Sequence, residues 1–160
     1  MQFTQSISYP GTVDEVVAMY LTPAYLERRF GQFVVEGSST VSAEGQRVSF
    51  AGTVRPELIP AAAARFVKSD LRIAFTEEWT TNEAGASSRT SVTVDGAPVS
   101  VEATSTLTGT ETGCTREVTG NVSVRVPLLG GRIEKEAVAH LGRVVEREQA
   151  LATQWLEEHR

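Results

Sequence analysis

The sequence predicts an α+β domain in which a long C-terminal helix covers one antiparallel sheet. Three observations predict it: alternation of apolar and polar residues at the N-terminus, a central stretch of β-branched residues broken by short turns, and a long amphipathic run at the C-terminus. A sheet with one apolar face needs a cover, and only the C-terminal run is long enough to provide it. The 160 residues fit one domain, residues 1–160.

The N-terminal segment is predicted to form a strand and two short helices. Residues 3–9 alternate as in a half-buried strand, and Pro10-Gly11 follows. Thr12 and Glu15 have the spacing of a capping box, so a first helix is expected to about residue 20. A second helix is expected over residues 23–30, because a threonine precedes a proline at its first position.

Residues 32–125 are predicted to form a meander of four to six strands. Short connections with turn residues separate the candidate strands, as in consecutive hairpins. The candidates are residues 33–41, 46–55, 71–81, 88–94, 99–108 and 115–125. Residues 56–64, with two prolines and four consecutive alanines, interrupt this rhythm. They are either a longer connection over an opening or a short helical turn.

The C-terminal helix is expected over residues 132–157, after Pro127 and Gly130-Gly131 end the last strand. Its apolar residues recur at helical spacing and are expected to face the sheet. They are Ile133, Ala137, Leu141, Val144, Leu151 and Trp155.

Three polar residues occupy positions where these patterns predict apolar ones. His140 and Glu148 interrupt the helical stripe, and Glu77 falls in the inward set of its strand between Phe75 and Trp79. Each also has a structural explanation: a helix-flank position for His140, and a register slip or bulge that turns Glu77 outward. For Glu148 it is an edge position from which the side chain reaches solvent or pairs with an arginine such as Arg147. Otherwise they point into a hollow, since small residues such as Ala103 and Ser105 between Val101 and Leu107 leave volume unfilled beneath the helix.

Composition excludes several classes of function. Fifteen Lys plus Arg against twenty Asp plus Glu give a net charge of −5, which repels a nucleic-acid duplex or an anionic membrane at long range and disfavours a nucleic-acid partner. No apolar run is long enough to span a membrane and no signal sequence is visible, so a cytoplasmic protein is expected. The single cysteine, Cys114, is expected to be exposed at a hairpin. No metal spacing, phosphate loop or nucleophile motif is present, so neither a metal nor a cofactor is expected.

The order of elements resembles the START-like helix-grip superfamily, also called the polyketide cyclase and lipid-transport or Bet v 1-like (SRPBCC) group. More narrowly, the opening FTQSISYPGTVDEVVAMYLTPAYLERR, the Glu77-Glu78-Trp79 strand and the ending VPLLGGRIEKEAVAHLGRVVEREQALATQWL are similar to the DUF2505 proteins. The resemblance covers essentially the whole chain. It implies a seven-stranded antiparallel sheet curled around the terminal helix, with a cavity between them that binds hydrophobic or amphipathic molecules in many relatives.

Three functions follow as hypotheses. The first is binding of a lipid-like or aromatic small molecule by a monomer or weak homodimer. The ligand-binding residues expected for it are Phe75, Glu77, Trp79, Val101, Ala103, His140, Val144, Glu148, Leu151 and Trp155. The second is a cofactor-independent cyclase, dehydratase or isomerase, in which Glu77 or Glu148, with a raised pKa, removes a proton and His140 polarises a carbonyl. The third is a protein-interaction domain without a ligand.

Overall fold

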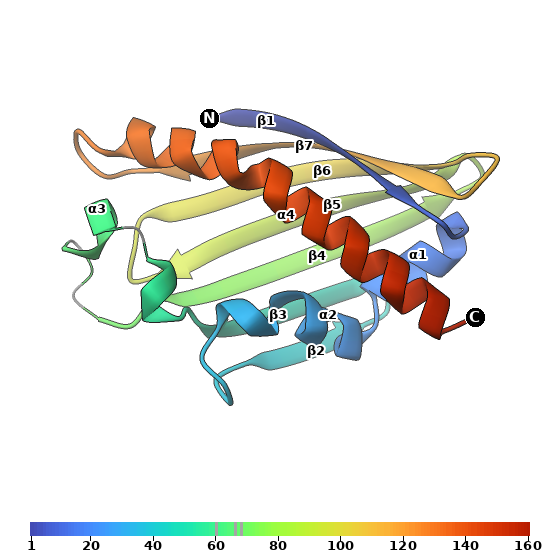
Figure 1. Ribbon diagram of the computed structural model, residues 1–160, viewed down its shortest axis with the longest axis horizontal. Helices are drawn as coiled ribbons and strands as arrows, with labels where there is room; N and C mark the ends of the chain where they lie inside the picture. The colour runs from blue at the N-terminus through green and yellow to red at the C-terminus, as the bar shows by residue number, and fades with distance from the viewer. Residues whose placement is uncertain (60, 66, 68) are drawn as a thin grey trace.

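The computed structural model describes residues 1–59, 61–65, 67 and 69–160. Within this part of the chain, seven strands form one antiparallel sheet in the order β1-β7-β6-β5-β4-β3-β2 (Figure 1). The strands are β1 (Gln2–Tyr9), β2 (Thr40–Glu44), β3 (Arg47–Thr53), β4 (Arg72–Asn82), β5 (Gly85–Asp95), β6 (Val99–Gly109) and β7 (Cys114–Val124). The predicted α+β architecture with a seven-stranded sheet is confirmed.

Helices α1 (Val13–Tyr20) and α2 (Pro23–Phe30) follow β1, as predicted. The capping box at the start of α1 is complete, because the Glu15 N–H donates to Thr12 Oγ1 at 3.1 Å and the Thr12 N–H donates to Glu15 Oε1 at 3.1 Å. Such a cap contributes about 1 kcal/mol to a helix. A short 3₁₀ turn, η1 (Gly31–Phe33), extends α2.

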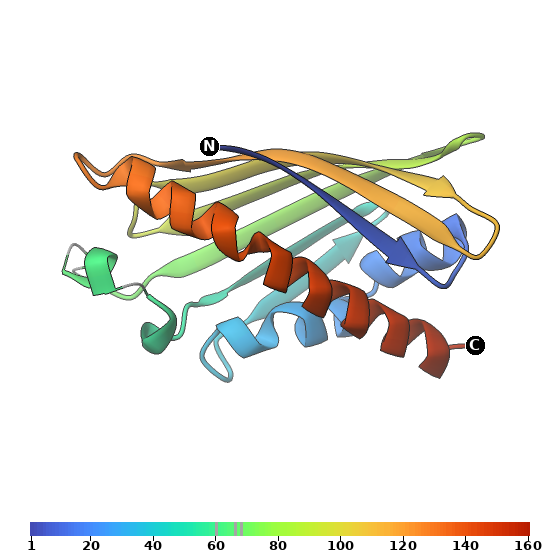
Figure 2. The same ribbon diagram turned by 45° about the horizontal axis from the view of Figure 1, so that its top comes forward.

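The register divides the sheet into a polar outer face and a largely apolar inner face. Directly paired residues share a face, so the pairs Phe75↔Val92 and Val92↔Val101 place these three side chains together inside. Their neighbours in the strands, mostly Thr, Ser, Glu and Arg, fall on the outer face. Helix α4 (Gly130–Glu158) crosses the inner face diagonally (Figures 1 and 2).

Aromatic residues fill the half of the inner face that lies against α1 and α2. Trp79, Tyr20 and Tyr25 are each no more than 1% exposed. Tyr20 stacks on Trp79 with ring centres 5.5 Å apart, and Tyr25 meets Trp155 of α4 edge to face at 5.4 Å. Burial of each such side chain contributes roughly 1.5–3 kcal/mol, so this half is a packed core.

The N-terminal half of α4 packs much less tightly than its C-terminal half. Apart from Gly130, the buried residues of α4 are Ala152, Trp155 and Leu156 in its last two turns. Val144 is 49% exposed although it lies one turn before Glu148 on the same helical face. On the inner face of the sheet, Val92 and Val101 are only half-buried. The first turns of α4 therefore do not fill the inner face.

Two local predictions, for residues 33–41 and for Cys114, differ from the structure, and the two alternatives for residues 56–64 are decided by it. The segment 33–41 is not one strand: Gly37 has φ 79°, and Ser38 Oγ donates to the Val35 carbonyl, so a turn precedes β2. The connection 56–64 contains both a 3₁₀ turn, η2 (Pro56–Leu58), and a helical turn, α3 (Ala61–Ala64); residue 60 lies outside the described residues. Cys114 is buried, because its strand begins at the hairpin and turns it inward.

Candidate functional site

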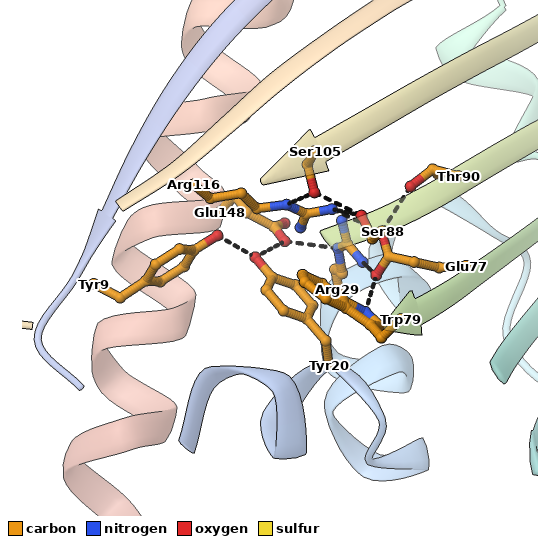
Figure 3. A network of polar contacts seen from close by, with 10 residues as sticks. All are labelled: Tyr9, Tyr20, Arg29, Glu77, Trp79, Ser88, Thr90, Ser105, Arg116 and Glu148. Carbon is orange, nitrogen blue, oxygen red and sulfur yellow. Dashed lines mark hydrogen bonds and ion pairs between the residues drawn. The ribbon is translucent and has the colours of Figure 1, made fainter. Parts of the chain in front are cut away.

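A network of buried charges lies at the aromatic half of the inner face (Figure 3). Glu77 of β4 and Arg116 of β7 are its centre, with 0% and 4% of their side chains exposed. Arg116 Nη2 donates to Glu77 Oε2 at 2.8 Å, although two strands separate β4 from β7. Ser88 and Ser105, on those intervening strands, accept further hydrogen bonds from Arg116 at 3.1 and 2.9 Å. The sheet thus supplies a complete set of partners for the guanidinium.

The remaining acceptor capacity of Glu77 is also used. Trp79 Nε1 donates to Oε1 at 3.0 Å, and Thr90 Oγ1 donates to Oε2 at 2.8 Å. Because period-two alternation places Trp79 and Glu77 on one face and the register brings Thr90 opposite Glu77, these bonds follow from strand geometry. No bulge turns Glu77 outward, so its predicted inward position is found.

A second acid–base pair joins the network from the helices. Arg29 Nε of α2 lies 2.7 Å from Glu148 Oε1 of α4, and Arg29 Nη1 lies 3.8 Å from Glu77 Oε1. The Arg29 N–H groups do not meet hydrogen-bond geometry, so these contacts are ion pairs by distance alone. Tyr20 donates to Glu148 at 3.1 Å and shares a 2.6 Å hydrogen bond with Tyr9. The two negative charges of Glu77 and Glu148 therefore balance the two positive charges of Arg29 and Arg116.

The electrostatics of Glu77 are those of a permanent carboxylate. Burial alone would raise the pKa of Glu77, but Arg116, Arg29 and the Thr90 hydrogen bond together outweigh it and hold the pKa below its ordinary value. A general base at neutral pH needs the opposite shift. The expected raised pKa of Glu77 is therefore wrong, because the sequence pattern showed the apolar neighbours but not the two arginines.

The structure does not bring His140 to either acid. His140 is exposed, and among the described residues none of the hydrogen bonds or ion pairs of Glu77 and Glu148 involves it. Two helical turns separate it from Glu148, about 12 Å along the axis. The predicted mechanism required His140 to share a pocket with a carboxylate, so the geometry does not support it.

The other predicted ligand-binding residues fall into two groups. Phe75, Trp79 and Trp155 are buried in side-chain clusters, where they pack against protein. Val101, Ala103 and Leu151 are half-buried, and Val144 is exposed. Side chains therefore occupy the aromatic part of the predicted site, whereas the part beneath the first turns of α4 is accessible.

An apolar pocket of about 210 Å³ lies at the other end of the sheet, and we call it the end pocket. It shares no residue with the predicted ligand-binding set. Each element that meets at this end contributes apolar side chains, including Val54, Leu58, Val94, Val99, Val124 and Ile133. Val54 directly follows β3, Leu58 lies in η2, and Ile133 lies in the first turn of α4.

Sequence reasoning missed Arg116, Arg29 and the end pocket. Arg116 had a usable signal, since it occupies an inward position of β7 by the same alternation that identified Glu77. The signal at Arg29 was ambiguous: with Arg28 it has the pattern of an anion clamp, but a cation near a helix C-terminus is favoured by the helix dipole alone. The connection 56–64 was noted as possible cover for an opening, and Leu58 and Ile59 do line the end pocket.

Neither a candidate metal site nor a candidate membrane-spanning helix is present among the residues that the structure describes. No group of three or more His, Cys, Asp and Glu side chains there could hold a metal ion. No helix in that part of the chain has the length and apolarity needed to cross a membrane.

Sequence comparison gives a family and distant relatives. The profile of the family described as "Protein of unknown function (DUF2505)" matches residues 4–156. Uncharacterized protein Rv0481c of Mycobacterium tuberculosis is 27% identical over 168 residues, covering 96% of this chain and 95% of its own length. Uncharacterized protein Mb0491c of Mycobacterium bovis matches with the same identity and coverage.

Comparison with solved structures identifies the fold. Norcoclaurine synthase from Thalictrum flavum, in complex with dopamine and hydroxybenzaldehyde, is similar with a TM-score of 0.62 at 12% identity, covering 100% of this chain and 88% of that chain. The Zhui aromatase/cyclase from Streptomyces sp. R1128 has a TM-score of 0.57 at 13% identity, covering 98% and 93%. A conserved protein from Geobacillus kaustophilus has a TM-score of 0.60 at 18% identity, covering 99% and 96%. The chain has the helix-grip fold.

Proposed function

We propose that this chain, which belongs to the DUF2505 family, binds the apolar part of a small molecule in the end pocket. The observation that carries the proposal is the lining of that pocket, where aliphatic side chains from the sheet, η2 and α4 surround about 210 Å³. Water gains few hydrogen bonds in such a space, so an apolar group displaces it favourably, by about 25 cal/mol per Å² of apolar surface buried. The helix-grip fold supports the same class of function, small-molecule binding.

The volume limits what can enter. A cavity of about 150 Å³ lined by aliphatic and aromatic groups is known to hold one benzene molecule. At about 210 Å³, the end pocket fits one aromatic ring with a short substituent, or a short alkyl chain. A lipid with two long chains does not fit within it. Neighbours that act on or bind aromatic molecules, such as the synthase complex with dopamine and hydroxybenzaldehyde, support the aromatic alternative.

The rest of the ligand would extend beneath the first turns of α4. Val101 and Ala103 are half-buried on the inner face, and Val144 of α4 is exposed. Four residues of β4 separate Ile73, level with the end pocket, from Glu77, or about 13 Å. Glu148 and Arg29, whose side chains are 12% and 13% exposed, would meet a polar group at that distance. His140 would meet one nearer the surface.

Binding rather than catalysis is the favoured activity. Glu77 is ion-paired and holds a low pKa, and His140 lies apart from it, so the acid–base pair that the enzyme hypothesis needs is not assembled. We retain a cytoplasmic monomer or weak homodimer as part of the proposal. Mass spectrometry of molecules extracted from the purified protein should identify the natural ligand.

A homologous series of 4-alkylphenols tests the proposal directly. If the alkyl chain enters the end pocket, affinity measured by calorimetry should rise roughly fourfold per methylene, as about 0.8 kcal/mol per CH₂ predicts, and then level off when the pocket is full. Val94→Phe should abolish the rise, because the ring occupies the space. Since that space is empty, the variant should keep its melting temperature.

Thr93→Phe is the matched control, because it adds the same ring at the next position of β5 on the outer face. It should bind the series as the wild type does. The proposal is wrong if affinity does not depend on chain length in the wild type. It is also wrong if Val94→Phe binds normally, or if it loses about 1–3 kcal/mol of stability as an overpacked core would.

A further inference from the structure

The turn that leads into α4 holds a leucine in an unusual backbone conformation. Leu128 has φ 68°, and the N–H of Leu129 donates to the Val126 carbonyl at 3.3 Å. Proline at the second position, here Pro127, and a positive φ at the third are features of a type II turn, which favours Gly or Asn at the third. The Leu128 side chain is 103% exposed. Neither backbone preference nor burial within the chain accounts for a leucine here.

This turn, residues 126–131, stands beside the mouth of the end pocket, and we call it the entry turn. Val126 within it and Ile133 just after it both line the pocket. Leu58, which lines the pocket from η2, is itself 48% exposed. Figure 1 shows the start of α4 and helix α3 at the same end of the sheet. Exposed apolar groups are therefore gathered around the pocket mouth, as at an interaction surface.

The charges next to the entry turn are mostly positive. Arg125, Arg132 and Lys135 are exposed on either side of it. Glu134 turns away from this surface, because its Oε2 accepts a hydrogen bond from the Val124 N–H at 2.8 Å. Glu136 approaches Arg132 at 3.9 Å and offsets it in part.

The opposite rim of the pocket mouth carries exposed acids, Glu57 and Asp95. Exposed Arg65 lies on that rim too, between the lining residues Ala63 and Val67, so the opposite rim carries both signs of charge. The whole chain has a net charge of −5, but at physiological salt charges more than about 8 Å from a surface are largely screened. At short range, the three cations beside the entry turn consequently determine its attraction to an anionic surface.

We propose that the entry turn docks on the surface of an anionic lipid bilayer. Leu128 enters the boundary between headgroups and acyl chains, while Arg125, Arg132 and Lys135 face the headgroups. Docked in this way, the mouth of the end pocket opens onto the lipid, so an apolar group passes between bilayer and pocket without crossing water. The inference goes beyond ligand binding, and it is measured independently of it.

Sedimentation with vesicles tests the docking. Wild-type protein should bind vesicles of phosphatidylcholine mixed with phosphatidylglycerol, more weakly vesicles of phosphatidylcholine alone, and less as salt is added. Leu128→Gly suits the positive φ and removes the inserted side chain, so its partition coefficient should fall about tenfold or more. Arg125→Glu with Lys135→Glu should remove the preference for phosphatidylglycerol.

Two control variants distinguish docking through the entry turn from nonspecific adsorption to vesicles. Val144→Ala shortens another exposed apolar side chain of α4, and Arg89→Glu reverses a charge on the outer face; both should bind vesicles as the wild type does. The proposal fails if the wild type does not bind anionic vesicles, as expected if the turn meets a protein instead. It also fails if Leu128→Gly binds normally or if Val144→Ala loses as much. Alkylphenol affinity in Leu128→Gly, measured without vesicles, should be unchanged, so the two proposals can fail separately.

Discussion

Removing the charge of Glu77 should destabilise the fold far more than removing that of its neighbour Glu78. Glu77→Gln leaves Arg116 buried with its serine hydrogen bonds but without its counter-charge. An unpaired buried charge costs about 3–5 kcal/mol. At roughly 2–4 °C per kcal/mol for a domain of this size, the melting temperature should fall by about 10 °C. Glu78 pairs with Arg47 at 3.9 Å with both side chains more than 60% exposed, so Glu78→Gln should cost less than about 1 kcal/mol.

The double variant Glu77→Gln with Arg116→Met completes the test. Both charges of the central pair are gone, and the remaining Arg29 and Glu148 balance each other, so most of the lost stability should return. Urea unfolding followed by circular dichroism measures five proteins: the wild type, Glu77→Gln, Arg116→Met, the double variant and Glu78→Gln. The reasoning is refuted if Glu77→Gln is as mild as Glu78→Gln, or if the double variant loses the sum of the two single losses.

Two further predictions concern pH. Because the folded-state pKa of Glu77 lies below the ordinary 4.5, its contribution to stability should be complete above pH 4.5 and lost as the pH falls through the folded value. The free energy of unfolding of Glu77→Gln, measured in urea, should lack this part of the decline at acid pH. Identical pH profiles for the variant and the wild type would contradict the prediction. All three tyrosines, Tyr9, Tyr20 and Tyr25, are buried with pKa values raised above 10 by that burial, so stability should fall as the pH rises past 10 and the unfolded tyrosines ionise. Phenolate absorbance should then appear together with loss of the near-ultraviolet circular dichroism, and its appearance in protein that keeps this signal would count against the prediction.

Most of the fold could be predicted because each of its elements has a local sequence pattern. The capping box of α1, the alternation of β4 to β7 and the helical spacing of α4 each depend on residues within one element. The prediction of one strand over residues 33–41 was wrong. The composition there is typical of a strand, whereas Gly37 and the Ser38 hydroxyl bend the backbone. Boundaries set by such side-chain hydrogen bonds are not visible in periodicity.

The network of buried charges was predictable only in part, because its ion pairs join residues from different strands and helices. Alternation placed Glu77 inside and helical spacing placed Glu148 on the same side as Trp155, but neither rule names a partner. Arg116 reaches Glu77 across two strands, and Arg29 comes from a different helix. The end pocket depends on where strands end and on a connection whose path no period describes.

The spread of the charged network along the chain has a consequence for how the protein assembles. Its members range from Tyr9 in the first strand to Glu148 in the last helix, with Arg29, Glu77 and Arg116 between. A fragment that lacks β4, β7, α2 or α4 leaves one of the four charges without a counter-charge, and contacts so distant in sequence form late and slowly. A chain emerging from the ribosome gains Glu148, the nearer partner of Arg29, only when α4 arrives, so the buried charges balance only after α4 has docked.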